Sequence, residues 1–237
     1  MKRLLAVLAV VGLAITAGCL GTGTLDDAAL NEPANYDWNT THDATVTIDN
    51  GSYRAVLTLH NQQNVSLFGP GEFGGQSALP VSAVQYRYPN GTVLNASSLT
   101  VGEKDERTVI EAPTTSGKMA YTGEIRSSSL YLSVAVNGSH AVTLPPGTDV
   151  RAPVVGQATP RNYEMVSDTD RHTLIWENPE TEVISVDYYS ERNLYIFVGV
   201  LGIGTVIAGA GVLYFRRQLA ELAARRGQMD PDETLER

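Results

Sequence analysis

The stretch from Ala44 to His60, ATVTIDNGSYRAVLTLH, alternates apolar and polar residues on both sides of an Asn-Gly pair. Such alternation is typical of strands with one buried face, because successive side chains of a strand point to opposite sides. Asn-Gly fits the type I′ turn of a two-residue hairpin, since both central residues of that turn need a positive φ. The stretch therefore predicts two antiparallel strands joined by a tight turn.

The same signal occurs twice more, at Asn90-Gly91 and at Asn137-Gly138. Further strands are expected in four short runs rich in β-branched and aromatic residues: 108–112, 119–125, 173–177 and 183–189. The pattern predicts a mainly β ectodomain over residues 44–190, folded as an antiparallel sandwich. The term Ig-like would describe its architecture only, because a chain with one cysteine cannot form the immunoglobulin disulfide.

A second stretch, Leu194 to Phe215, reads LYIFVGVLGIGTVIAGAGVLYF and contains no charged residue. About 20 consecutive apolar residues can cross a bilayer as a helix, so residues 194–215 predict one transmembrane helix. A buried helix of a soluble protein is the alternative, but such helices seldom stay uncharged on every face. Four arginines follow the stretch, namely Arg216, Arg217, Arg225 and Arg226. They predict that the tail, residues 216–237, is cytoplasmic and that the preceding domain is extracellular.

Small residues recur within the predicted span. Gly204 and Ala208, like Thr205 and Gly209, lie four positions apart and therefore on one side of a helix. Such pairs let two helix backbones approach closely, which makes a homo-oligomer a candidate arrangement. Glycine is common in membrane helices for other reasons, so the oligomeric state stays open.

The amino terminus has the features of a secretory signal peptide, residues 1–18: a basic start, a short apolar run and small residues at its end. The end, Thr16-Ala17-Gly18-Cys19, resembles a lipobox. It predicts lipidation of Cys19, the single cysteine of the chain. The alternative is a plain signal peptide followed by an incidental cysteine.

The chain is acidic, with a formal net charge of −9, and the acidity lies in the predicted ectodomain. Between Leu20 and Arg192 there are 21 Asp and Glu but 10 Lys and Arg. Such a domain repels polyanions, which argues against nucleic acid as a partner. Residues 19–43 predict a lipidated acidic spacer, with one helical turn near residues 26–30. Acidity with few lysines also suits a halophilic protein that stays soluble in concentrated salt.

Six Asn-x-Ser/Thr sequons lie in the segment predicted to face outward, at Asn39, Asn50, Asn64, Asn90, Asn95 and Asn137. On a secreted domain they are candidate glycosylation sites. Three of them precede glycine, so their asparagine has a second explanation as a turn residue.

The sequence predicts no catalytic residue, no metal site and no cofactor. Its histidines, at positions 42, 60, 140 and 172, lack the spacing of a metal motif and are expected at the surface. The loop from Gly69 to Ser77 fits the letters G-x-G-x-x-G. Pro70 and the following Pro80 are incompatible with the helix that this motif requires, so we expect a mobile loop instead.

Several features together carry a resemblance. The lipobox, the acidic β-rich domain, the turn Trp176-Glu-Asn-Pro179, the pair Tyr188-Tyr189 before one terminal span and the Arg-rich tail are found along nearly the whole chain. In this combination the chain resembles a family of uncharacterised haloarchaeal membrane lipoproteins, a domain of unknown function. The resemblance implies a salt-rich cell surface, and it implies no substrate, cofactor or site residue.

Three functional classes remain. The leading prediction is a non-catalytic module of the cell surface, anchored in the membrane, that binds or assembles with envelope proteins. The second is a solute-binding or sensory ectodomain, which needs a pocket, lined for example by Tyr and His, with residues 69–77 as a candidate lid. The third is a secreted hydrolase, for which a Ser within hydrogen-bond reach of a His would be evidence.

Overall fold

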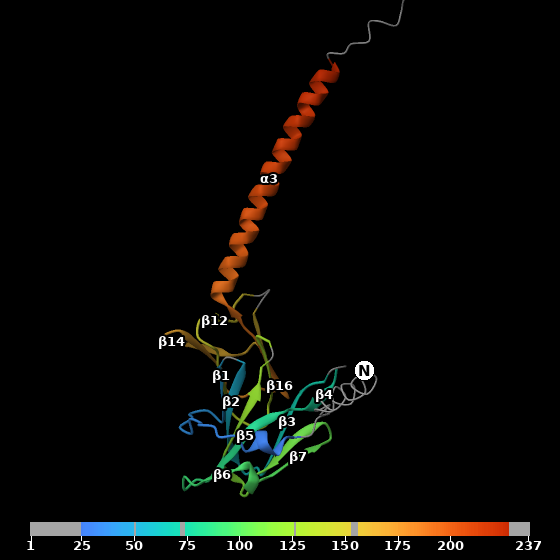
Figure 1. Ribbon diagram of the computed structural model, residues 1–237. Helices are drawn as coiled ribbons and strands as arrows, with labels where there is room; N and C mark the ends of the chain where they lie inside the picture. Colours follow the sequence, from blue (N-terminus) through green and yellow to red (C-terminus); the bar gives the residue numbers. More distant parts are fainter. Residues whose placement is uncertain (1–24, 50, 72–73, 126, 153–155, 228–237) are drawn as a thin grey trace, which may run out of the picture. The chain divides into compact units, whose positions relative to one another are not determined.

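The computed structural model describes residues 25–49, 51–71, 74–125, 127–152 and 156–227 (Figure 1). The chain divides into two compact units, Met1–Tyr188 and Tyr189–Arg237, which are considered separately. The predicted signal peptide, the candidate lipidation site Cys19 and the sequon residue Asn50 lie outside the described residues.

The first unit contains an eight-stranded sheet (Figure 1). Its strands, in spatial order, are β14 Glu164–Asp168, β15 Arg171–Trp176, β11 His140–Thr143, β1 Ala44–Asp49, β2 Ser52–His60, β9 Ser116–Glu124, β5 Val81–Arg87 and β6 Val93–Asn95. Neighbouring strands are antiparallel, except that β1 and β11 are parallel. The centre of the sheet thus departs from the purely antiparallel arrangement that the sequence predicts.

Two smaller sheets and a few short elements complete the unit. One sheet consists of β4 Gln76–Ala78, β3 Asn64–Pro70, β8 Arg107–Glu111 and β7 Thr100–Lys104, in that order. The other consists of β10 Ser129–Ser133, β16 Val183–Asp187 and β13 Gln157–Thr159. The short elements are helix α2 Asp27–Leu30, the 3-10 turn η1 Ala96–Ser98 and strand β12 Thr148–Asp149.

One hydrophobic cluster contains residues of all three sheets. On β1 its members are Ala44, Val46 and Ile48, which alternate with the less buried Thr45 and Thr47. Because residues of β3, β8, β10 and β16 belong to the same cluster, the smaller sheets cover one face of the large sheet. We call this the inner face, and we call the face that carries Thr45 and Thr47 the outer face. The prediction of a mainly β domain is confirmed.

Two of the three predicted hairpins are confirmed. β1 and β2 are joined through Gly51, whose φ is 78°, and β5 and β6 are joined by a turn that contains Gly91, whose φ is 91°. Gly in these turns adopts a backbone conformation that other residues avoid.

The third predicted hairpin, at Asn137-Gly138, is wrong. β10 before it and β11 after it belong to different sheets, so this segment is a crossover. Gly138 does have a positive φ of 106°, but a Cβ atom at this position would collide with the carboxylate of Asp43. The Asn-Gly pair is therefore explained by a close approach to a distant residue, which the local sequence does not reveal.

The four further predicted strands are present as β8, β9, β15 and β16. The predicted loop at residues 69–77 is ordered at both of its ends, because Gly69 pairs with Ser77 and Pro70 with Gln76. The described residues of the segment thus belong to the β3–β4 hairpin, and strand β5 rather than a nucleotide-binding helix follows it.

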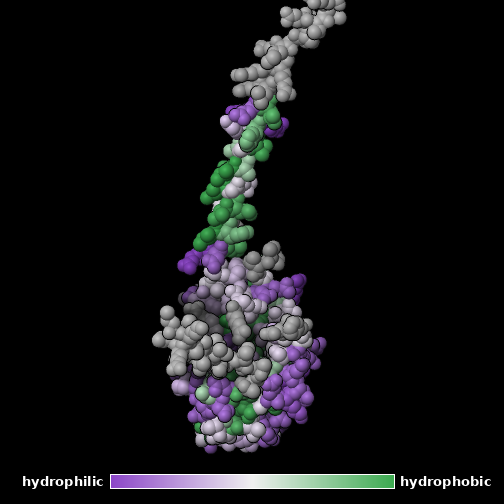
Figure 2. Space-filling model, turned by 45° about the vertical axis from the view of Figure 1, so that its right-hand side comes forward, coloured by the Kyte–Doolittle hydropathy of each residue, from purple (hydrophilic) through white to green (hydrophobic). Residues whose placement is uncertain are grey.

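The second unit begins with β17 Tyr189–Ser190 and continues as helix α3 Glu191–Gly227. Figure 2 shows hydrophobic side chains along this helix, with hydrophilic residues towards each end. Within the described residues, α3 is long and apolar enough to cross a membrane. Arg216, Arg217, Arg225 and Arg226 continue the same helix, so the span and the first part of the tail form one element.

The small residues of the predicted span all lie on α3. Among the described residues, no other side chain approaches the Cβ position of Gly204 or Gly209 within 4 Å. The hydroxyl of Thr205 donates to the carbonyl of Leu201 at 2.8 Å, so its hydrogen bond is made within its own helix.

Candidate functional site

A segment before β1 covers part of the outer face. Tyr36 is buried there in a small hydrophobic cluster with Val56, Ala83 and Ala120. Its hydroxyl donates to the carbonyl of Ala83 at 2.8 Å and lies 2.8 Å from Thr122 Oγ1. Desolvation raises the pKa of Tyr36 to about 12, which keeps this hydroxyl protonated. The segment of residues 31–43, which the sequence predicts to be a spacer, thus contacts the sheet through Tyr36.

Lys118 of β9 holds the next part of the segment. Its Nζ atom donates to the carbonyl of Trp38 at 2.8 Å and to Thr40 Oγ1 at 2.7 Å. Desolvation lowers the pKa of Lys118, and the charge of Arg87 lowers it further. The backbone N–H of Asn39 donates to Asp37 Oδ1 at 3.0 Å, which closes a turn in the segment. These bonds fix the segment without any ligand.

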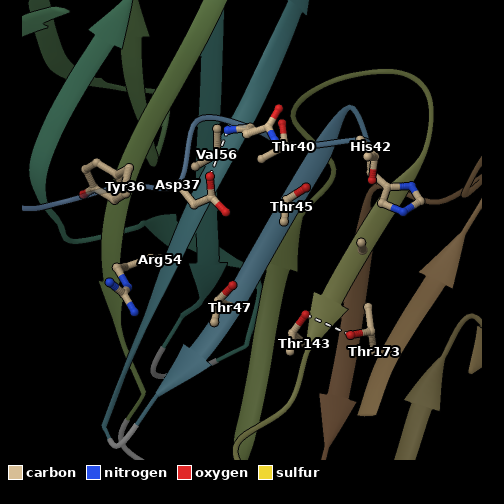
Figure 3. Close-up of a pocket in the computed structure, with 13 residues that line it drawn as sticks. Tyr36, Asp37, Thr40, His42, Thr45, Thr47, Arg54, Val56, Thr143 and Thr173 are labelled. Atoms are coloured by element: carbon tan, nitrogen blue, oxygen red, sulfur yellow. Dashed lines mark hydrogen bonds between the residues drawn. The ribbon is translucent and has the colours of Figure 1, made fainter. Parts of the chain in front are cut away.

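A groove of about 480 Å³ lies between this segment and the sheet (Figure 3). We call it the outer-face groove. Most of its lining side chains are polar, and six of the thirteen are threonines. The lining residues are Tyr36, Asp37, Asn39, Thr40, Thr41, His42, Thr45, Thr47, Arg54, Val56, Ala141, Thr143 and Thr173.

The floor of the groove follows the register of four neighbouring strands. Thr47 on β1 pairs with Arg54 on β2 and with Thr143 on β11, and Thr143 pairs with Thr173 on β15. Three hydroxyls therefore cross β1, β11 and β15 in one row, with strands about 4.8 Å apart. The Oγ1 atoms of Thr143 and Thr173 are 3.0 Å apart, as the dashed line in Figure 3 shows.

The next row of the floor is less polar. Thr45 lies between Val56 on β2 and Ala141 on β11, and neither neighbour can form a side-chain hydrogen bond. Thr45 Oγ1 is buried and has no hydrogen-bond partner in the described part of the chain. A buried hydroxyl that forms no hydrogen bond costs about 1–3 kcal/mol.

The charged side chains of the lining balance one another. Arg54 is the guanidinium among the lining residues and Asp37 is the carboxylate. Arg54 is already paired, because its Nη2 lies 2.5 Å from Asp49 Oδ2 at the end of β1. Its Nη1 donates to the carbonyl of Asn35 at 3.4 Å. With one guanidinium and one carboxylate, the lining has no formal net charge, although the chain carries a net charge of −9.

The four histidines do not gather at one place. His42 lines the groove, His60 lies 2.9 Å from Asp43 Oδ1, and His172 contacts Ser167. His140 is buried, although the sequence analysis expected it at the surface. Burial lowers its pKa, although a hydrogen bond with the carbonyl of Gly138 acts in the opposite direction. No group of three or more His, Cys, Asp or Glu that could hold a metal occurs among the described residues.

One serine lies within hydrogen-bond reach of a histidine. Ser167 Oγ is 2.8 Å from His172 Nδ1, the kind of contact that the sequence analysis named as evidence for a hydrolase. The two residues are exposed cross-strand neighbours on β14 and β15. Triads of hydrolases add a carboxylate on the other nitrogen of the histidine. Within the described residues, no carboxylate is bonded to His172.

A second cluster contains Ser139, Asp43 and His60. Ser139 Oγ lies 3.1 Å from Asp43 Oδ2, and His60 Nε2 lies 2.9 Å from Asp43 Oδ1. The carboxylate is in the middle, whereas a hydrolase needs the histidine there. Partial burial acts to raise the pKa of Asp43, but hydrogen bonds from Ser139 and His60 outweigh it and hold this pKa below its usual value. Asp43 is therefore a weak base, and its contacts join β1 to β11.

The predicted glycosylation sites lie on the surface where they are described. Five sequon asparagines are exposed: Asn39, Asn64, Asn90, Asn95 and Asn137. Asn39 differs from the others because it also lines the groove. The candidate lid, residues 69–77, contributes no lining residue. Among the described residues of this loop, 69–71 and 74–77, none therefore contacts the groove.

Sequence reasoning missed the groove. The alternation in β1 does predict that Thr45 and Thr47 face away from the core. It cannot predict that Thr143 and Thr173 lie beside them, because that placement depends on the parallel pairing of β1 with β11. Threonine at outward positions of several strands was the available signal.

A family model matches residues 40–234, which include the floor of the groove and α3. The description of this family is "Family of unknown function (DUF5803)". The chain belongs to the DUF5803 family. The predicted membership of a family of unknown function is thereby confirmed. No curated protein and no solved structure matches this DUF5803 chain.

Proposed function

We propose that this chain is a non-catalytic binding module of the cell surface, anchored in the membrane, and that the outer-face groove is its binding site. The groove carries the proposal. Its volume of about 480 Å³ falls in the range of about 300–1,000 Å³ that is usual for ligand sites. Its wall is held by Tyr36 and Lys118 without a ligand, which reduces the conformational entropy lost on binding.

Helix α3 serves as the anchor in this proposal. The arginines after the span, Arg216 and Arg217 first, favour a cytoplasmic carboxyl end and an extracellular domain. A lipid on Cys19 would hold the amino end at the same membrane surface. In this arrangement the domain is a sandwich, Ig-like in its layers only, that faces a salt-rich medium and envelope proteins.

The arrangement of the serines supports a binding role over a catalytic one. The Ser167–His172 pair is exposed on two neighbouring strands, and no lining residue of the groove belongs to it. In the other cluster, Asp43 separates Ser139 from His60. Neither arrangement gives a serine a base that a third group orients.

A solute-binding or sensory ectodomain is the second candidate. Tyr36 and His42 in the lining favour it, since a pocket with Tyr and His was the feature expected of that class. The lining as a whole is less favourable, because solute pockets are mostly apolar and Val56 and Ala141 are the aliphatic side chains here.

Site-specific photo-crosslinking on intact cells tests the binding role. A photo-reactive residue at Thr41, exposed at the groove, also removes the Asn39 sequon, so it should form an adduct with an envelope component other than a glycan on Asn39. The same residue at Thr100, exposed on β7, is the matched control and should form none. Equal adducts from both positions, or none from Thr41, would contradict the assignment of the groove.

Protease accessibility tests the orientation. A protease added to intact cells should cleave the domain before Arg192 and spare a tag placed after Arg237. A protected domain with a cleaved tag would mean that the arginines lie outside, contrary to the proposal. Cys19→Ser should abolish lipid labelling and leave the chain in the membrane, because the span alone retains it.

A further inference from the structure

We propose that the outer-face groove binds a neutral saccharide chain. This inference rests on the proposed function, because it names the ligand class of the same groove. It is based on four observations: the hydroxyl content of the lining, its balance of charge, the pairing of the floor strands and the position of one sequon.

The lining consists mainly of groups that both donate and accept hydrogen bonds. Thr47, Thr143 and Thr173 place three hydroxyls in one row across neighbouring strands (Figure 3). Thr40 and Asn39 add a hydroxyl and an amide from the wall. A ligand whose own groups also donate and accept along its length matches such a surface, and a sugar chain has hydroxyls of this kind on every residue.

The charge of the groove excludes two other polar ligand classes. The lining has one guanidinium, Arg54, and one carboxylate, Asp37, and Arg54 is already engaged by Asp49, which Arg171 also contacts at 3.2 Å. A phosphorylated or sulfated ligand needs unpaired basic groups, and a polycation needs several acidic ones. The lining offers neither, so we infer an uncharged ligand.

The pairing of the floor strands argues against an extended peptide. β1, β2, β11 and β15 each have a neighbour on both sides in the sheet. Their backbone N–H and C=O groups are therefore used by the sheet, and a peptide cannot add to them as a further strand. Val56 and Ala141 are the aliphatic side chains of the lining, so an apolar side chain of a peptide would meet few partners of its own kind.

One sequon places a glycosylation site in the groove itself. Asn39 is exposed, lies in the lining and is followed two positions later by Thr41. A saccharide in the groove has two sources: a glycan attached to Asn39 of this chain, or a sugar chain of another molecule. Both share the chemistry inferred above.

Binding of defined sugars tests the inference. The full-length chain, in nanodiscs free of sugar-based detergent, is applied to an immobilised panel of neutral, carboxylated and sulfated oligosaccharides. We expect binding to neutral members and not to sulfated ones. The double variant Thr143→Val, Thr173→Val keeps the shape of the floor, and it should weaken binding by about tenfold or more because two hydrogen-bonding groups are lost.

The matched control is Thr58→Val. Thr58 lies on the same face of β2 as Arg54 and Val56 but outside the groove lining, so this variant should bind like the unaltered chain. Equal loss in the control and in the double variant would overturn the inference. So would a preference for sulfated sugars.

Glycopeptide mass spectrometry of the native protein distinguishes the two sources. If Asn39 carries a glycan that occupies the groove, Asn39→Gln should bind a free neutral sugar about tenfold or more tightly, since a tethered competitor is removed. An unmodified Asn39 together with sugar binding assigns the ligand to another molecule.

Failure of the inference is distinguishable from failure of the proposed function. Crosslinks from Thr41 without any binding to the sugar panel, and with an adduct that is an unglycosylated protein, would overturn the saccharide and keep the binding module. Absence of crosslinks, together with absence of sugar binding by both the unaltered chain and Asn39→Gln, would overturn both.

Discussion

The two faces of the eight-stranded sheet are built in opposite ways from the same strands. On β1, Val46 and Ile48 of the inner face are 0 % exposed and pack into a core shared by three sheets. Thr45 and Thr47 of the outer face line a groove. The inner face is stabilised by apolar burial, worth about 25 cal/mol per Å². The outer face is partly covered by the segment that Tyr36 and Lys118 hold through hydrogen bonds, and polar side chains of this face line the groove.

The largest effect is expected from the inner face. Trp176→Ala should lower the free energy of unfolding by about 3–5 kcal/mol, because a large buried ring leaves a cavity. Trp176 is 0 % exposed, and its Nε1 donates to the carbonyl of Pro160 at 2.8 Å. Denaturant titration followed by circular dichroism measures the change. A loss below about 1 kcal/mol would mean that this region is not the core.

A nearly isosteric change tests the inner face more finely. Val46→Thr keeps the shape of the side chain but places a hydroxyl in the apolar core, so stability should fall by about 1–3 kcal/mol. The same titration measures it. If the variant is as stable as the unaltered chain, the two faces of β1 would not differ in the way described here.

An intermediate effect is expected where the segment docks on the outer face. Tyr36→Phe removes the bonds to Ala83 and Thr122, which should cost about 1–2 kcal/mol at neutral pH. Tyr36→Phe should also reduce the loss of unfolding free energy that occurs as the pH rises into the alkaline range. The pKa of Tyr36 is about 12 in the folded chain, whereas an unfolded tyrosine has a pKa of about 10.

The sign follows from proton binding. From about pH 10 to about pH 12 the unfolded chain loses the proton and the folded chain keeps it, so stability falls as pH rises. Titrations at about pH 8 and about pH 11 compare the two chains. The burial of Tyr53 and Tyr121 raises their pKa values as well, so part of the alkaline loss should persist in Tyr36→Phe. An identical loss in both chains would contradict a docked Tyr36.

The smallest effect, and one of opposite sign, is expected at Thr45. Thr45→Val removes a buried hydroxyl that has no partner, so it should raise stability by up to about 1 kcal/mol. The pair Val46→Thr and Thr45→Val makes reciprocal changes at adjacent positions. Destabilisation by both would show that Thr45 Oγ1 has a hydrogen bond in solution, such as one to water.

Local pattern was sufficient for most of the strands. The alternation from Ala44 to His60 predicted β1, β2 and their turn, because neighbouring strands in a hairpin depend on adjacent sequence. The apolar run that begins at Leu194 likewise predicted a helix, since length and lack of charge are local properties. These are the parts of the chain in which nearby residues determine the structure.

The features that could not be predicted depend on contacts between residues far apart in the sequence. Asn137-Gly138 resembles a hairpin turn, but its glycine is required by Asp43, 95 positions earlier in the numbering. The groove depends on the same long-range placement, because β11 and β15 bring Thr143 and Thr173 to β1. No local pattern encodes which strand becomes the parallel neighbour of β1. The sequence therefore predicts that these threonines face outward, but not that they lie side by side.

The parallel pairing of β1 with β11 has a consequence for synthesis of the chain. A ribosome releases the β1–β2 hairpin long before it releases β11, so one edge of β1 has no partner during that interval. Open strand edges attract other strands and favour aggregation. A chaperone that covers the free edge of β1 until β11 has been synthesised would reduce aggregation of the unfinished domain.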